Sequence, residues 1–537
     1  MKQNNATSGL LATTLIFLLA LQAIEAHASH PATKQVAPKL IVGITVDQLR
    51  TDFINALQGK LTSGGFRRLL GQSLMFEQVL YNCDMPDATA AMAVLATGVE
   101  PFYNGVTGQN TFDAQQLRRQ SILFDKDVTG TFSSLQVSPK ALLSTTLGDE
   151  LKIASEGTSR IYSIAPDAET AIIGAGHMGD CALWFDEKEA KWAGSSYYRE
   201  FPKYFVKKND QQPLSVHLGS LRWEPMVKSD DRLEIMPYSP ISNGFSHDFI
   251  QYGKHAYSWI KTSPVINDAI VELARLSMRD GKIGKGKNTD MLQLTLYAGT
   301  YQHAAPEAYA EELQDIYLRL DKSLNDLLNY IDAEVGLSNT FIYVNGTGQV
   351  ATPSSEIANL SQGIFTASRC TSLLNSYLIS LYGQGNWVAG YHDNQIYLAH
   401  DFIARQNIKL SEIQQAASEF VMMFSGVADV VTQHQILHNV ANERIENLRK
   451  IYNRKTGGDL VITLQPGWAF KEKDNSPTQQ QLRHDIAPGP AIFFFPGITP
   501  KRITAPINAK AIAPTLARLI RIRAPSGCTT APVSLNQ

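Results

Sequence analysis

The sequence predicts an α/β fold in which a central, mostly parallel sheet lies between helices. Continuous apolar runs recur along the chain, and this is the pattern of strands that are buried on both faces. Between them lie segments in which apolar residues recur every three or four positions, as in amphipathic helices. The composition agrees, because 44% of the 537 residues are hydrophobic and only 18% are charged, which excludes a disordered chain.

The clearest predicted strand is KLIVGITVD, residues 39–47, which ends at the carboxylate of Asp47. A parallel strand ends at the carboxyl edge of its sheet, where the sites of α/β proteins form. Segments 291–297, 340–345 and 490–495 have the same apolar pattern and are predicted as similar strands. The clearest helix is indicated by one apolar face made of Leu313, Ile316, Leu320, Leu324, Leu327 and Ile331.

Two stretches interrupt this alternation and are predicted as insertions into a single α/β domain that spans residues 29–537. The first, at about 195–280, is rich in Tyr, Trp, Phe and Pro, and we expect it to form a cap over the sheet edge. The second, at about 386–473, shows alternating strand and helix patterns and is expected to form a second subdomain.

The first 28 residues have the pattern of a cleavable signal peptide. The apolar run at 10–21 is too short to span a bilayer, and Ala26-His27-Ala28 is the small-x-small pattern of a cleavage site. The alternative is an N-terminal membrane anchor, but no cluster of Lys or Arg follows the apolar run. We therefore expect a periplasmic or secreted protein with no transmembrane segment in the mature chain.

Charge and cysteine content limit the classes of partner and of covalent link. The 48 Lys and Arg against 50 Asp and Glu give a net charge of −2, which disfavours the broad cationic surface of a nucleic-acid-binding protein. Cys83, Cys181, Cys370 and Cys528 are far apart and allow three disulfide pairings, while buried free thiols are the alternative.

Several segments together resemble the alkaline phosphatase superfamily, in particular its periplasmic phosphomonoesterases and type I phosphodiesterase-like members. They include KLIVGITVDQLRTDF, GGFRRLLGQSLMFEQVLYN and LATGVEPFYNGVTGQNTFD in the first quarter of the chain, and IAPTLARLIRIRAPSGC near its end. The resemblance implies an alkaline-phosphatase-like core. It also implies a site in which two zinc ions bind a phosphate ester while a Thr or Ser attacks phosphorus.

The resemblance assigns the metal ligands to positions that have largely changed in this sequence. Asp47 matches the first metal-binding aspartate, and His303 matches a histidine whose accompanying acid is replaced by Gly299 or Thr300. The Asp-His pair expected after the next strand is Gly346-Thr347.

The last histidine of the resemblance falls on Pro488. His484 lies four residues earlier and would reach the site only if the loop were rebuilt. A zinc site needs three or four ligands, so the remaining set predicts no bound zinc.

The nucleophile and the phosphate-binding residues have also changed. Alignment on the segment Ala96-Thr97-Gly98 places Ala88 at the nucleophile, and Thr89 is one residue further, about 100° around a helix. The Lys and Arg that would hold the phosphoryl group are Asp167 and Glu169, and an Asn that touches it is Gln109.

We therefore expect a pseudoenzyme without a cofactor. Its acidic cleft would bind a cationic or neutral small molecule, or a protein partner, through side chains that include Asp47, Asp84, Asp87, Asp167 and Glu169. The alternative is an active metal-dependent phosphomonoesterase or phosphodiesterase with a rearranged zinc site. It would use Thr89 as nucleophile and Asp47 with His303 or His484 as ligands. A structural envelope protein is a third class.

Overall fold

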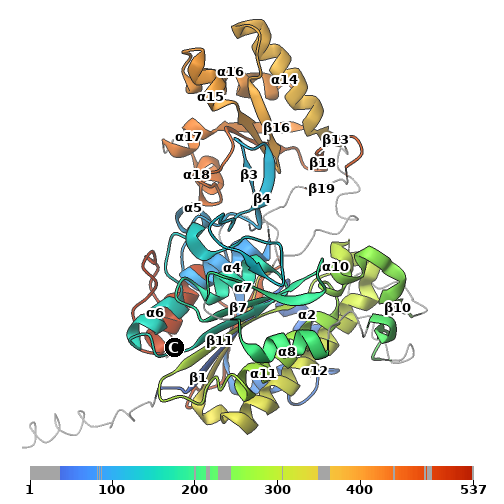
Figure 1. Ribbon diagram of the computed structural model, residues 1–537, viewed down its shortest axis with the longest axis vertical. Helices are drawn as coiled ribbons and strands as arrows, with labels where there is room; N and C mark the ends of the chain where they lie inside the picture. The colour runs from blue at the N-terminus through green and yellow to red at the C-terminus, as the bar shows by residue number, and fades with distance from the viewer. Residues whose placement is uncertain are drawn as a thin grey trace, which may run out of the picture. The chain divides into compact units, whose positions relative to one another are not determined.

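The computed structural model describes residues 37–81, 83, 85, 87–198, 201–212, 218–227, 244–304, 306–348, 363–438, 442–476, 479–480 and 487–534 (Figure 1). The predicted signal peptide and His484 lie outside these residues, as does Asp84. The chain from Pro38 onward forms one compact unit.

A large central sheet organises this unit (Figure 1). Its strand order is β21-β2-β20-β12-β1-β11-β6-β7-β8-β5, and the short β22 also pairs with β2. The strands are β1 (Leu40–Asp47), β2 (Leu74–Leu80), β5 (Gly130–Thr131), β6 (Ile161–Ala165), β7 (Cys181–Asp186), β8 (Lys191–Ser195), β11 (Asp290–Tyr297), β12 (Thr340–Gly346), β20 (Gly489–Phe494), β21 (Lys501–Ile503) and β22 (Ile507–Asn508).

The middle of the sheet is parallel, as predicted. Strand β1 pairs in parallel with β11 on one side and β12 on the other, and β6 and β7 continue the parallel set. Strand β20 departs from the prediction because it runs antiparallel to both β12 and β2. Its first residue, Gly489, therefore lies beside the last residue of β12, Gly346.

Helices cover both faces of the sheet because β1 alternates its side chains between two apolar clusters. Leu40, Val42 and Ile44 pack with helices on one face, whereas Ile41 packs with helices on the other. The first face carries α2 (Thr51–Leu57), α3 (Phe66–Gln72), α11 (Pro264–Arg279) and α12 (Ala310–Glu334). The second carries α4 (Ala88–Thr97), α6 (Leu147–Ala154), α7 (Ala168–Ala175) and α19 (Ile512–Leu519). Helix α12 is the helix predicted from its apolar face.

Residues 363–480 contain a smaller sheet with its own hydrophobic core. The strand order of this sheet is β14-β15-β17-β16, and a second group pairs β13-β18-β19. The strands are β13 (Gly363–Thr366), β14 (Val388–His392), β15 (Gln395–Leu398), β16 (Val427–Thr432), β17 (Leu460–Leu464), β18 (Trp468–Lys471) and β19 (Gln479–Gln480). The helices are α14 (Ala367–Tyr382), α15 (His400–Arg405), α16 (Leu410–Val421), α17 (Gln433–Leu437) and α18 (Glu443–Lys450). We call residues 363–480 the subdomain.

The segment expected to form a cap contains short elements before the long helix α11. They are α8 (Lys203–Gln211), β9 (Arg222–Trp223), β10 (His247–Asp248) and α10 (Ala256–Ile260). Two further elements precede it in the chain and bear on the site: the short helix α5 (Pro101–Asn104) and the hairpin of β3 (Asn110–Asp113) and β4 (Arg118–Ser121).

All four cysteines are free thiols, so none of the three possible pairings is formed. Three of them, Cys83, Cys181 and Cys370, are buried. None of the helices in the described ranges is long and apolar enough to cross a membrane.

Candidate functional site

The carboxyl ends of β1 and β12 meet the start of β20, and this edge carries the predicted metal-binding position. Asp47 is the last residue of β1. Its carboxylate Oδ1 accepts a hydrogen bond of 3.0 Å from Thr347 Oγ1, and that hydroxyl accepts one of 2.8 Å from the backbone N–H of Gln48. Burial raises the pKa of Asp47 to about 7, although the bond from Thr347 lowers it.

The backbone of β20 occupies the space beside Gly346. A Cβ atom built on Gly346 would lie 2.6 Å from the carbonyl oxygen of Leu49 and 3.0 Å from Gly489 Cα. A Cβ built on Gly489 would in turn lie 2.7 Å from the carbonyl carbon of Gly346. Only glycine fits this close approach of two backbones. An aspartate at position 346, as the resemblance would require, has no room here.

Helix α4 begins next to Asp47. Asp87 is its N-cap, and the two carboxylate oxygens accept bonds from the N–H groups of Ala90 (3.0 Å) and Gln109 (2.6 Å). Burial raises the pKa of Asp87, although these two N–H groups lower it. Ala88 is the first helical residue, and Thr89 is 3% exposed. Thr89 therefore lies within the packing of α4, whereas Ala88 is only half-buried.

The start of helix α7 holds the two predicted acidic substitutions. Glu169 is 5% exposed and accepts bonds from Ser121 Oγ (2.6 Å) and Gln109 Nε2 (3.2 Å). Burial raises the pKa of Glu169, although the bond from Ser121 lowers it. The structure therefore brings Gln109 and Glu169 together, with the β3–β4 hairpin supplying their neighbour Ser121.

A lysine that the sequence did not point to reaches the other acid of this helix. Lys261, directly after α10, places its Nζ 2.9 Å from Asp167 Oδ1 and 3.8 Å from Glu187. Burial lowers the pKa of Lys261, but the hydrogen bond and charge of Asp167, together with the charges of Glu187 and Glu169, outweigh burial and raise it. The positive charge of Lys261 therefore offsets part of the negative charge of the acidic residues at this edge. No motif marks Lys261, and only the fold brings it to Asp167.

His303 lies in a turn after β11, beside Tyr297. The Tyr297 hydroxyl donates to the Thr300 carbonyl at 2.6 Å and lies 3.4 Å from His303 Nδ1. His303 is largely exposed and has a φ of 52°, in the left-handed region. The His303 ring packs edge-on against Tyr297, with ring centres 5.8 Å apart.

These residues do not fit the two zinc ions that the resemblance implies. In the part of the chain that the structure describes, no three His, Cys, Asp or Glu side chains converge on a common point. The Asp47 carboxylate already accepts a bond from Thr347, and Gly346 has no side chain. Since zinc needs three or four ligands, the described residues at this edge do not by themselves form a zinc site.

Comparison with known proteins establishes the family. The sequence profile of the type I phosphodiesterase / nucleotide pyrophosphatase family matches residues 41–487. The chain therefore belongs to this family, within the alkaline phosphatase superfamily.

Individual relatives cover nearly the whole chain. Alkaline phosphatase PhoV of Synechococcus elongatus is 27% identical and covers 91% of both chains. Alkaline phosphatase PafA of Elizabethkingia meningoseptica is 26% identical over 93% of this chain and 94% of its own. A protein of Myroides odoratus named calcium-transporting ATPase is 28% identical over 92% and 94%. The crystal structure of wild-type PafA superimposes with a TM-score of 0.78 at 24% identity, covering 93% of this chain and 98% of that one, and so shows the same fold.

Proposed function

We propose that this protein keeps the fold of the alkaline phosphatase superfamily but does not catalyse two-zinc phosphoryl transfer. The observation that carries the proposal is the contact between Gly346 and Gly489 beside Asp47. This contact fills the space that a second metal-binding carboxylate would need. Thr347 also holds the Asp47 carboxylate by a hydrogen bond, where the resemblance would require a histidine that binds metal.

The first turn of helix α4 supports the same proposal. Ala88 has no nucleophilic atom, and Thr89 is buried in the packing of the helix. Rotating α4 to present Thr89 would remove apolar side chains from the core. This would lower the free energy of unfolding.

The remodelled cleft has the chemistry of a binding site for a neutral polar or cationic ligand. Glu169, Asp87 and Asp47 supply acceptor oxygens, and burial raises the pKa of each carboxyl. Because the pKa of Asp47 is raised to about 7, a fraction of this carboxyl keeps a proton near neutral pH and can also donate. A phosphate dianion would meet these acids instead of the cations that the resemblance calls for. Lys261 is already paired with Asp167.

The experiment that tests the loss of activity measures metal and turnover together. The purified chain is analysed for zinc and assayed with p-nitrophenyl phosphate and bis-p-nitrophenyl phosphate, beside Thr89→Ala. We expect less than one zinc per chain, no turnover with either ester, and no difference for the variant. Two zinc ions per chain, with turnover that Thr89→Ala abolishes, would establish the active hydrolase instead.

The binding role is tested by thermal shift against neutral and cationic small molecules, using the wild type, Glu169→Gln and the exposed control Glu156→Gln. A ligand of the cleft should raise Tm of the wild type and of the control but not of Glu169→Gln. A ligand that stabilises all three equally binds elsewhere and gives no support to this role.

A further inference from the structure

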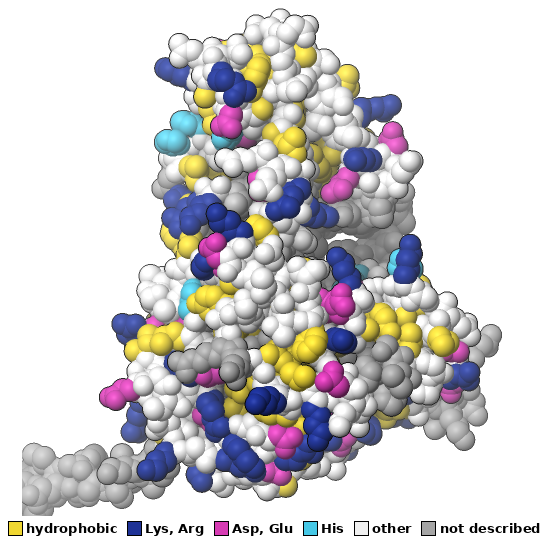
Figure 2. All heavy atoms as spheres, viewed as in Figure 1, with side chains coloured by type: hydrophobic (Ala, Val, Ile, Leu, Met, Phe, Trp, Pro, Cys, Tyr) yellow, Lys and Arg dark blue, Asp and Glu magenta, His cyan; other side chains and the backbone are white. Residues whose placement is uncertain are grey.

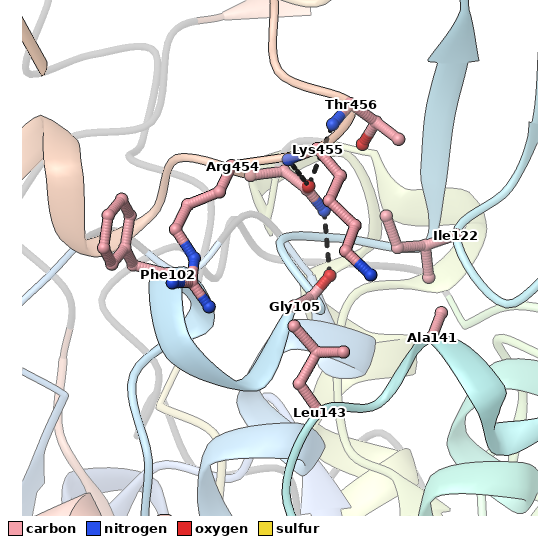
Figure 3. A pocket seen from close by; sticks show the side chains of 9 residues that line it. Phe102, Gly105, Ile122, Ala141, Leu143, Arg454, Lys455 and Thr456 are labelled. Atoms are coloured by element: carbon pink, nitrogen blue, oxygen red, sulfur yellow. Dashed lines mark hydrogen bonds between the residues drawn. The ribbon is translucent and has the colours of Figure 1, made fainter. Parts of the chain in front are cut away.

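A cavity lies away from the candidate site, between the main α/β unit and the loop 453–456 of the subdomain. Helix α5 and residues 141–143, just before α6, form its wall on the side of the main unit. Its volume is about 380 Å³, within the range of small-molecule sites. The wall from the main α/β unit is mostly apolar and consists of Phe102, Gly105, Ile122, Ala141 and Leu143. The opposite wall consists of the four loop residues (Figure 3). None of the candidate cleft residues lines this cavity.

The loop is fixed in place by Asn453. Its Nδ2 donates to the carbonyl of Gly105 at 2.9 Å, and its Oδ1 accepts from the backbone N–H groups of Lys455 (2.9 Å) and Thr456 (3.0 Å) (Figure 3). One side chain thus ties the loop to the opposite wall and sets the direction of the next residues. The cavity is therefore preorganised, which reduces the entropy lost when a ligand binds.

The charged residues that line the cavity are both cations. Lys455 and Arg454 make no ion pair within the described residues, and no Asp or Glu lines the cavity. Figure 3 shows the Lys455 side chain directed toward Ile122 and Ala141, and Arg454 extended toward Phe102. Both side chains are exposed, so an anion in the cavity can reach them, and the apolar wall can hold its uncharged part.

A second guanidinium strengthens the positive potential at this place. Arg449 of α18 and Arg454 each lie 5.0 Å from the ring centre of Phe102, and Arg454 also lies 5.8 Å from that of Tyr103. Figure 2 shows Lys and Arg side chains gathered where α5 and α18 lie in Figure 1. The aromatic rings hold the guanidinium groups in position by cation–π contacts.

One hydroxyl of the cavity wall has no protein partner. Thr456 Oγ1 is buried and makes no hydrogen bond to any described residue. Buried polar groups in folded proteins are nearly always hydrogen-bonded, so an unpartnered hydroxyl beside a cavity indicates a ligand or a water molecule there. As a donor, it suits an anionic oxygen.

We propose that this cavity binds a small organic anion, with its carboxylate, phosphate or sulfonate group at Lys455, Arg454 and Thr456, and its apolar part against Ile122, Ala141 and Leu143. The proposal does not depend on the loss of phosphatase activity, because its residues are outside the cleft. It gives the loop between α18 and β17 a role in ligand recognition.

A pair of fluorescent probes tests both halves of this chemistry on the full chain. The first is 1-anilinonaphthalene-8-sulfonate, which is an anion, and the second is the uncharged N-phenyl-1-naphthylamine. The wild type should bind the sulfonate about tenfold more tightly than the neutral probe, as expected for one charge-assisted contact. Equal affinity for the two probes would overturn the proposal.

The variants locate the binding. Lys455→Gln should weaken sulfonate binding about tenfold and leave the neutral probe unchanged, whereas Ala141→Phe should fill the cavity and weaken both. The control Lys60→Gln, at an exposed turn, should change neither. If Lys455→Gln binds the sulfonate as the wild type does, or if Lys60→Gln weakens it equally, the proposal is wrong. Since Lys455 is exposed, its variant should fold, and a circular dichroism spectrum checks this.

Discussion

The body of the central sheet and its carboxyl edge differ sharply in this molecule. In the body, β1, β11 and β12 pair in parallel, and alternating side chains such as Ile44 and Leu294 are completely buried. At the edge, the same strands end in Asp47, a Gly346 packed on backbone, and a hydrogen-bonded Thr347. The body gives the chain the fold that it shares with PafA, whereas the edge carries the residues on which the proposed loss of metal chemistry rests.

The difference shows that fold and chemistry depend on separate sets of residues. The free energy of folding comes mostly from burial of apolar side chains in the body of the sheet and under its helices. The chemistry of a cleft depends on a few residues at strand ends and helix starts. PafA, which is only 24% identical in the structural comparison, therefore has the same fold as this chain.

The largest effect is expected from a change in the body of the sheet. Leu294→Ala removes a fully buried side chain of β11 and should lower the free energy of unfolding by about 4 kcal/mol, through lost burial and the cavity left behind. Urea unfolding followed by circular dichroism measures it. Leu373→Ala, on an exposed position of α14, should cost less than about 0.5 kcal/mol. Similar losses for both variants would contradict the view that the buried side chains of the sheet supply most of the free energy of folding.

Asp47→Asn should increase the free energy of unfolding, in contrast to Leu294→Ala. The pKa of Asp47 is about 7 in the folded protein and near 3.8 when unfolded, so the folded state binds the proton more tightly. Stability is then highest below pH 4 and falls as the pH rises to 7. The Asn variant removes this loss and should gain about 4 kcal/mol at pH 8 and nothing at pH 3.

The measurement is the free energy of unfolding at the two pH values. Asp474→Asn, at an exposed position, is the control and should show almost no difference. A protein that uses Asp47 to bind zinc would instead be destabilised by Asp47→Asn in the presence of zinc, and that result would reject the proposed loss of the metal site.

Gly346→Ala should destabilise the edge by about 2 kcal/mol, because the new methyl group meets the backbone of Leu49 and Gly489. Gly71→Ala in α3 is the matched control. A Cβ there meets no atom within 4 Å, so it should stabilise the protein by about 0.5 kcal/mol through helix propensity. Thermal unfolding of both variants checks the pair. A neutral Gly346→Ala would mean that the edge has room for a side chain after all.

The smallest effect is expected for the ion pair of Lys261 and Asp167. Both side chains are partly exposed, at 18% and 38%, so a double-mutant cycle with Lys261→Gln and Asp167→Asn should give a coupling of about 1 kcal/mol. The coupling should shrink in 1 M salt because the pair is reached by solvent. A coupling of zero would show that Lys261 does not neutralise the cleft.

The fold was largely predictable because apolar runs report burial directly. The strand expected at 39–47 is β1, Leu40–Asp47, and the helix with Leu313 and Leu320 on its apolar face is α12. The direction of β20 was not predictable. A buried strand has the same apolar pattern whether it runs parallel or antiparallel to its neighbours. Its direction depends on the path of the chain that connects it to them.

At the candidate site, the loss of catalytic groups at positions such as Ala88 and Gly346 stays a prediction. The sequence alone points to these positions because the family resemblance covers them. It does not show that β20 fills the space beside Gly346, because that contact joins residues 143 positions apart in the chain. Lys261 is 94 residues from Asp167 and no motif marks it, so its contact with Asp167 appears only in three dimensions.

The four free thiols have a practical consequence for how this protein can be made. Because no cysteine is cross-linked, native structure requires neither an oxidant nor a disulfide isomerase. Residues 38–537 should therefore reach the same Tm when expressed in a reducing bacterial cytoplasm as when exported, and addition of dithiothreitol should leave that Tm unchanged.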